Sequence, residues 1–358
     1  MAVNVRKGTP DVGLDRTEFE RRFRARFYDP QFSERADEIE RLLETAWDVY
    51  RAYRKSPRTR PAGPGFADPS YELSIEWTAA REAIAAAERR QKDASAPARV
   101  LVINGSPRSD QTCPGEMSKS YRLARLAEAT LAAEANLEVD FLDLSLLTSQ
   151  YERVIYPCKA CVSTAMPLCH WPCSCYPNHG AGQVNDWMNE LYPRWVAAHG
   201  IMIVCPVHWY QVPSAFKLMM DRLVCADGGN PDPTSTHGKD AQRAKEIELA
   251  GWDYPRHLAG RVFALAVHGD AEGVDGVRRL LHDWLVNMRL IPAGRLSQLG
   301  AYIGYQEPYA TSHDALDADH DVQEEVRNAA RSLAHAVALL RRGALAQPDT
   351  GLREPRQK

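Results

Sequence analysis

The sequence predicts an α/β fold in which a doubly wound, five-stranded parallel sheet follows an N-terminal helical extension. From Arg99 onward, five short runs of β-branched and apolar residues alternate with helical patterns. These runs are nearly continuous in apolar residues, which is typical of parallel strands covered on both faces. The residues before them carry two amphipathic helical patterns instead. We therefore expect a helical extension at 1–96, a sheet domain at 97–345 and a polar tail at 346–358.

Each predicted element rests on its own pattern. In the extension, apolar residues recur at helical spacing from Ile39 to Tyr53 and from Leu73 to Ala87. The last helix ends at Gly343, a suitable C-terminal cap. Five strands separated by helices fit a flavodoxin-like sheet. The predicted strands are 99–104, 137–144, 200–207, 261–269 and 301–305, and the helices between and after them are 121–134, 183–198, 215–224, 276–288 and 321–342.

Composition excludes several classes of partner. The chain has 358 residues, a net charge of -3 and a pI of about 6.4, so it has no general attraction to nucleic acid or anionic membranes. It shows no secretory leader and no run approaching the ~20 apolar residues of a membrane span. We expect a cytoplasmic protein with no nucleic-acid and no membrane partner. Cytosolic thiols are normally reduced, so clustered cysteines there bind metal or do redox chemistry more often than they form structural disulfides.

The loop after the first strand has the features of a phosphate site. In doubly wound sheets ligands bind beyond the carboxyl ends of the strands. The sequence there, "NGSPRSDQTCPGEMSKSYRLA", supplies a turn glycine, several hydroxyls, Arg108 and the start of a helix. It lacks both the dinucleotide fingerprint and the P-loop motif, so a monophosphate fits best. A Gly-Ser-Pro turn also occurs by chance in many loops, but its position after the first strand favours the phosphate.

Two further strand-end loops could hold a flat ring. After the third strand, Trp209 and Tyr210 could stack on a heterocycle, or could only pack the next helix against the sheet. After the fourth strand, the glycine-rich "HGDAEGVDG" could close over the same ring. The residues that we expect to contact the ring are Pro206, His208, Trp209, Tyr210, Gln211, His268 and Gly269.

Five of the eight cysteines lie in one stretch, "PCKACVSTAMPLCHWPCSCYPNH". Four thiolates, or three with His170 or His179, would satisfy a tetrahedral zinc site. Redox-active or simply packed thiols are the alternatives. Cys113, Cys205 and Cys225 are isolated, and Cys205 is most simply a core residue. The metal-ligand candidates are Cys158, Cys161, Cys169, Cys173 and Cys175.

Three motifs follow one another in the chain: "INGSPR", "PVHWYQVPSAFKLMMDRL" and "HGD". With these motifs in this order, the chain from about Arg99 to Tyr305 resembles the NADPH-dependent FMN reductases. The resemblance implies that FMN is the cofactor and NAD(P)H the co-substrate. It also implies a small acceptor: a quinone, a nitro or azo compound, a flavin or a metal ion. The flavin carries the hydride chemistry, so we name no catalytic residue. We also expect a homo-oligomer, either dimer or tetramer. The residues that would surround the FMN phosphate are Ser106, Arg108, Ser118 and Ser120.

The cysteine loop resembles, in part, the ligand motif of iron-sulfur flavoproteins, which implies a 4Fe-4S cluster as the alternative to zinc. Two other functions therefore stay open: an electron carrier with a protein partner, and a non-enzymatic flavin or zinc sensor. Flavodoxin carriers tend to be strongly acidic and this chain is not, which favours the enzyme. The insertion at 226–260 has little apolar content before Trp252, and it could be a lid or a subunit contact.

Overall fold

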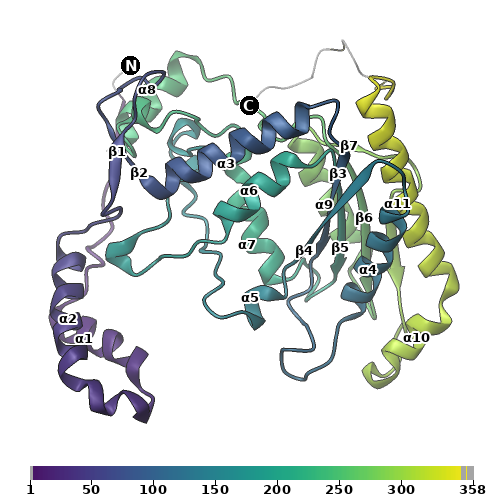
Figure 1. The fold of residues 1–358 in the computed structure, drawn as a ribbon, viewed down its shortest axis with the longest axis horizontal. Coiled ribbons are helices and arrows are strands. Elements are labelled where there is room, and N and C mark those ends of the chain that lie inside the picture. Colours follow the sequence, from purple (N-terminus) through teal and green to yellow (C-terminus); the bar gives the residue numbers. More distant parts are fainter. Residues whose placement is uncertain (1–2, 348–351, 353–358) are drawn as a thin grey trace. The chain divides into compact units, whose positions relative to one another are not determined.

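The computed structural model describes residues 3–347 and Leu352 (Figure 1). Most of the predicted tail at 346–358 therefore lies outside the described residues. Contacts group the chain into two compact units. The cysteine unit comprises Met1–Glu82, Val154–Asn189 and Val224–Pro255, and the sheet unit comprises Ala83–Arg153, Glu190–Leu223 and Arg256–Lys358. The cysteine unit thus includes Val154–Asn189 and Val224–Pro255, two segments that the sequence analysis placed in the domain at 97–345. The predicted domain boundaries stay a prediction.

The sheet unit confirms the predicted α/β fold with a doubly wound parallel sheet. Its strands run in the order β4-β3-β5-β6, and β7 and β8 both pair with β6. All of these pairings are parallel. The strands are β3 (Ala98–Asn104), β4 (Leu137–Asp143), β5 (Gly200–Pro206), β6 (Val262–Gly269), β7 (Ile291–Pro292) and β8 (Gln298–Tyr302).

The predicted count of five strands was wrong, because two strands share the position expected for the fifth. β7 pairs with Val262 and Phe263 at the start of β6, and β8 pairs with the residues from Leu265 to Gly269. The predicted fifth strand at 301–305 also ended too late. Gly304 has a φ of 65°, which is left-handed backbone that cannot continue a strand.

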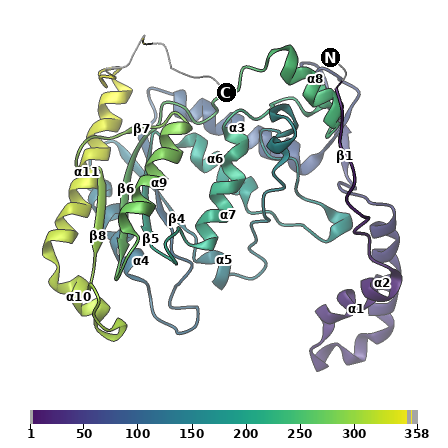
Figure 2. The ribbon, with the colours of Figure 1, turned by 180° about the vertical axis from the view of Figure 1, so that it is seen from behind.

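Helices cover both faces of this sheet (Figures 1 and 2). On one face, α4 and α11 pack against each other and against the strands, and on the other α9 packs on β6 and β8. The helix predicted from Gln183 begins only at Met188, because Asn185 has a φ of 59° and Asp186 pairs with Val154 in an isolated bridge. The helices that carry residues of the sheet unit are α3 (Ile75–Lys92), α4 (Lys119–Ala132), α5 (Leu146–Ser149), α6 (Met188–Ala197), α7 (Ser214–Arg222), α9 (Val274–Asn287), α10 (Ser312–Ala318) and α11 (His320–Arg341).

The core of the sheet unit explains the strand patterns. Every residue of β5 and β6 is buried, as expected for central parallel strands. On one face they meet apolar residues of α4 and α11, such as Leu131 and Leu333. At the end of α11, Gly343 has a φ of 66°, its N–H donates to Leu340 O, and the N–H of Ala344 donates to Leu339 O. This is a Schellman cap, which confirms Gly343 as the C-terminal cap.

The cysteine unit joins the N-terminal residues to the cysteine loop and the insertion. The Gly180 N–H donates to Arg54 O at 2.7 Å, and the Asp68 N–H donates to Thr234 Oγ1 at 3.0 Å. The insertion contains a helix, α8, and its role as a lid or a subunit contact stays a prediction. No helix in the described part of the chain is long and apolar enough to cross a membrane. The elements of this unit are α1 (Arg16–Arg24), α2 (Ala36–Arg51), β1 (Thr59–Pro61), β2 (Glu72–Ser74) and α8 (Ala241–Gly251).

Replacing Gly200 by alanine should destabilise the sheet unit. A Cβ at Gly200 would lie 2.7 Å from Val337 Cγ2 and 3.1 Å from Leu333 Cδ1, so α11 would have to shift. We expect a loss of about 1 to 3 kcal/mol in the free energy of unfolding, the usual cost of overpacking a core. Urea unfolding followed by tryptophan fluorescence measures it. The control is Gly276→Ala in α9, where a Cβ meets open space, and which should stabilise by about 0.5 to 1 kcal/mol. A Gly200→Ala protein as stable as the wild type would contradict the packing of α11 on β5.

Candidate functional site

A hollow of about 540 Å³ lies where the carboxyl ends of β3, β5 and β6 meet. Eight of the residues predicted to hold a cofactor line it: Ser106, Arg108, Ser118, Ser120, Pro206, His208, His268 and Gly269. They come from the last residues of β5 and β6, from the loops after β3 and β5, and from the start of α4, and the parallel sheet brings these segments to one edge. The sequence analysis missed Lys119, Asp270, and the segment after β8 that includes Tyr309, Ser312 and His313.

Two serine hydroxyls with available protons line the hollow, one in the loop after β3 and one at the start of α4. Ser118 is its N-cap, and the Ser118 Oγ accepts from the Tyr121 N–H at 3.1 Å. The Ser106 Oγ accepts from the Arg108 N–H at 3.2 Å. Each of these bonds uses the hydroxyl as an acceptor, so each proton is available to an anion. Together with the positive end of the α4 dipole, they form a suitable cradle for a phosphate.

Two cations border this cradle. Arg108 donates to the backbone oxygens of Glu116 and Met117 at 3.0 and 2.9 Å, and its guanidinium lies 3.2 Å from the Glu116 carboxylate. These bonds hold the Arg108 side chain against its own loop.

The second cation, Lys119, was missed although the two serines beside it were both predicted. Its Nζ donates to Ile303 O at 3.3 Å and lies 3.8 Å from Asp270 Oδ2. Burial lowers the pKa of Lys119, Asp270 opposes that shift, and Arg108 adds to it. A bound anion would offset the repulsion between the two cations.

His268 offers a buried polar atom without a partner. Its Nε2 lies 2.8 Å from Ser120 Oγ, and its Nδ1 is buried and makes no hydrogen bond. Burial is the main cause, and Lys119 and His208 add to it, in lowering the pKa of His268 to about 3. The ring is therefore neutral near pH 7. A buried ring nitrogen without a partner at the edge of a hollow is the kind of group that a bound ligand satisfies.

The aromatic loop is a tight turn. The His208 and Gln211 backbones exchange N–H to O bonds at 2.9 and 3.0 Å, and Trp209 and Tyr210 have φ values of 45° and 63°. This is left-handed backbone that bulky residues rarely adopt, and such strain concentrates at functional sites. Trp209 is 93% exposed, so it does not pack the next helix against the sheet. Trp209, Tyr210 and Gln211 do not line the hollow, and their contact with a ring stays a prediction.

Comparison with known proteins decides the family. Residues 98–299, more than half of the chain, match the NADPH-dependent FMN reductases. The chain belongs to this family. The predicted resemblance is therefore confirmed, and FMN is the cofactor that the family indicates. The hollow fits FMN, because its volume falls within the range of about 300 to 1,000 Å³ typical of small-molecule sites and its lining includes hydroxyls and cations that suit a phosphate.

The chain is also similar to individual flavoproteins. It is 27% identical over 126 residues to an iron-sulfur flavoprotein from Methanosarcina thermophila, covering 35% of this chain and 52% of that protein. The chain thus spans about half the length of that curated relative. Among solved structures, RosB with a bound 8-demethyl-8-formylriboflavin-5'-phosphate intermediate shows 15% identity and a TM-score of 0.48, covering 69% of this chain and 81% of RosB. FerB, a flavoenzyme NAD(P)H:(acceptor) oxidoreductase from Paracoccus denitrificans, shows 13% identity and a TM-score of 0.37, covering 67% and 97%.

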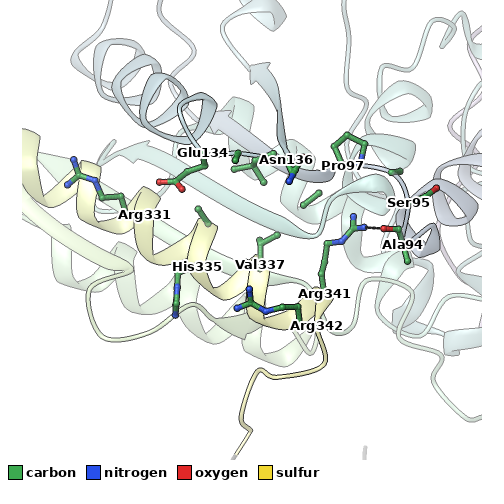
Figure 3. Close-up of a pocket in the computed structure, with 16 residues that line it drawn as sticks. Ala94, Ser95, Pro97, Glu134, Asn136, Arg331, His335, Val337, Arg341 and Arg342 are labelled. Atoms are coloured by element: carbon green, nitrogen blue, oxygen red, sulfur yellow. Dashed lines mark hydrogen bonds between the residues drawn. The ribbon is translucent and has the colours of Figure 1, made fainter.

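A larger hollow, of about 820 Å³, lies at the opposite, amino edge of the sheet (Figure 3). Arginines and a histidine of α11 line it, but Arg341 donates to the backbone oxygens of Asp93 and Ala94, and Arg331 pairs with Glu324. None of the strand-end motifs reaches this hollow. Arginines at a helix C-terminus also stabilise its free carbonyls, which accounts for their presence without a ligand. We therefore place the functional site in the smaller hollow.

The cysteine loop belongs to the other unit, and only part of it comes together. The Sγ atoms of Cys161 and Cys175 lie 3.4 Å apart, and Lys239 Nζ donates to Cys161 Sγ at 3.5 Å. Both ring nitrogens of His170 are bonded to hydroxyls, those of Ser174 and Thr236. Among the described residues, no three His, Cys, Asp or Glu side chains are arranged to hold a metal ion. The metal centre at these cysteines therefore stays a prediction.

The thiols differ in their electrostatic surroundings. The hydrogen bond with Cys175 lowers the pKa of Cys161 to about 6, burial opposes this shift, and the charge of Lys239 assists it. Burial raises the pKa of Cys169. Cys205 is buried within β5, which confirms it as a core residue, and burial raises its pKa as well. Cys113 is exposed and Cys225 is buried.

Replacing Arg108 by alanine should weaken FMN binding. A charge-assisted hydrogen bond contributes about 1.5 to 3 kcal/mol, so we expect the dissociation constant to rise by roughly 10- to 150-fold. Quenching of flavin fluorescence on titration with apoprotein measures it. Arg279→Ala in α9 is the matched control, since its side chain is 84% exposed and pairs only at 3.6 Å with Asp283. Equal affinities for Arg108→Ala and the wild type would remove Arg108 from the site.

Proposed function

We propose that the chain is an FMN-dependent oxidoreductase that takes hydride from NAD(P)H and reduces a small acceptor. A quinone, a nitro or azo compound, a free flavin or a metal ion would serve as acceptor. The observation that carries the proposal is the meeting of Ser106, Ser118, Arg108 and Lys119 around one hollow at the strand ends. Family membership supports FMN as the molecule that occupies it.

The side chains around the hollow would bind and orient the cofactor. The Ser106 and Ser118 hydroxyls would donate to the phosphate, and Arg108 and Lys119 would balance its charge. The Nδ1 of neutral His268 is available to a polar group of the ligand. When bound, FMN supplies the hydride chemistry, so the protein needs no acid or base of its own.

The aromatic turn would provide an open face for the second substrate. Trp209 and Tyr210 are 93% and 62% exposed and follow directly after Pro206, Val207 and His208, which line the hollow. Exposed aromatic rings at this position would offer a surface on which a nicotinamide or a flat acceptor can stack. Burial lowers the pKa of His208, against the opposing effect of Asp270, so its ring is neutral near pH 7. An uncharged ring is compatible with both a nicotinamide and an aromatic acceptor.

The assembly and the electron-carrier alternative stay predictions. We keep the expectation of a homo-oligomer, and light scattering of the purified protein tests it. The similarity to an iron-sulfur flavoprotein favours an electron carrier with a protein partner as the second candidate. That function would require an iron-sulfur cluster, which stays a prediction.

The FMN-loaded protein should oxidise NADH or NADPH in the presence of a small acceptor. The chain alone should not, because the flavin supplies the redox chemistry. Absorbance at the nicotinamide wavelength, followed with a panel of benzoquinone, a nitroarene, an azo dye, riboflavin and ferric citrate, gives the rate for each acceptor. A carrier would be indicated if FMN binds but none of these acceptors supports turnover. A protein that binds FMN and is not reduced by either nucleotide would contradict the enzyme and favour the sensor.

A further inference from the structure

The cysteine loop places two thiols in direct contact without bonding them. Cys161 Sγ and Cys175 Sγ are 3.4 Å apart, and both cysteines are free. A disulfide needs only a small further approach of the sulfur atoms. Cys175 is 6% exposed, whereas Cys161 is partly exposed. A small reagent can therefore reach the Cys161 thiol, whereas the Cys175 thiol is buried.

Two lysines from distant segments stand beside this pair. Lys239, from the insertion, donates from Nζ to Cys161 Sγ at 3.5 Å and to Leu168 O at 2.6 Å, so its ammonium is held in place. Lys55, from the N-terminal residues, donates to Ser174 O, next to Cys175. A fixed ammonium beside a thiol favours the thiolate, which is the nucleophilic form.

The cysteine loop is braced around this pair. The Tyr176 hydroxyl donates to Pro157 O at 2.7 Å, and the Tyr176 ring stacks on Tyr156 with the ring centres 4.9 Å apart. The Trp77 Nε1 donates to Pro172 O at 2.8 Å. These contacts join the two ends of the loop and tie it to the N-terminal residues. The contact between the sulfurs is thus part of a packed structure.

We propose that Cys161 and Cys175 form a redox-active dithiol that a small hydroperoxide converts to a disulfide. The assignment is independent of the flavin site and of any metal. It also gives Lys239 a role, since its ammonium donates to the Cys161 sulfur and to the Leu168 carbonyl.

The chemistry balances in two steps. The Cys161 thiolate attacks one peroxide oxygen, the O–O bond breaks, and the other oxygen leaves as hydroxide or alkoxide, giving a sulfenic acid. The Cys175 sulfur then attacks the Cys161 sulfur, and the sulfenic oxygen leaves as water with the Cys175 proton. Two electrons pass from the thiol pair to the peroxide. A dithiol reductant reverses the reaction by thiol-disulfide exchange.

The test treats the full chain, reduced and freed of reductant under argon, with one equivalent of hydrogen peroxide. Titration should show that two of the eight thiols disappear, and peptide mapping should find Cys161 linked to Cys175. Dithiothreitol should restore both. In Cys175→Ser, Cys161 should remain a sulfenic acid that dimedone traps. In Lys239→Gln, Cys161 should react at least several-fold more slowly.

The matched control is Cys113→Ser, which removes an exposed cysteine and should leave both the linkage and its rate unchanged. If Cys175→Ser fails to fold, peptide mapping of the oxidised wild-type protein still shows whether Cys161 and Cys175 are linked. Oxidation that begins at another cysteine, or that leaves Cys161 and Cys175 unlinked, overturns the proposal. A bound metal would also overturn the proposal. In that case the anaerobically purified protein would contain zinc, or iron with sulfide, and both thiols would react with peroxide only after a chelator removes the metal.

Discussion

The parallel register of β3, β5 and β6 determines which side chains meet at the candidate site. Asn104 pairs with Val204, and Pro206 pairs with His268, so the three strands end at nearly the same level. Burial on both faces enforces this register, because a slip of one residue would turn every side chain of a strand to the other face. The serines of one loop, the turn of the second and the histidine of the third depend on this alignment.

Much of the fold and of the site could be predicted, because the ligand-binding loops of such a sheet directly follow its strands. Ser106, His208 and His268 were found in this way. The sequence could not show which neighbouring side chains turn inward, so Lys119 was missed between two predicted serines. It also could not show that Trp209 and Tyr210 adopt left-handed backbone and are largely exposed to solvent. Local turns separate β7 from β8, which pair with different parts of β6. A pattern of apolar residues does not predict such turns.

The surroundings of the cysteine loop could not be predicted from its spacing. Five cysteines in one short stretch predict a metal centre, which stays a prediction, but the lysines beside them, Lys55 and Lys239, are far away in the sequence. Their positions follow from packing of the N-terminal residues and the insertion around the loop. Ammonium groups beside sulfur change the chemistry that a thiol can do, because they favour the thiolate. The loop's chemistry therefore depends on all three segments of the cysteine unit.

The central claim is that the hollow at the strand ends holds a flavin by its phosphate. Comparing the dissociation constants of FMN and riboflavin, which lacks the phosphate, tests this claim most directly. Calorimetric titration of the flavin-free protein gives both values under the same conditions. Several charge-assisted hydrogen bonds to the phosphate should make FMN bind roughly 100-fold or more tightly than riboflavin. Equal affinity for the two flavins would show that the serines, Arg108 and Lys119 do not bind the phosphate.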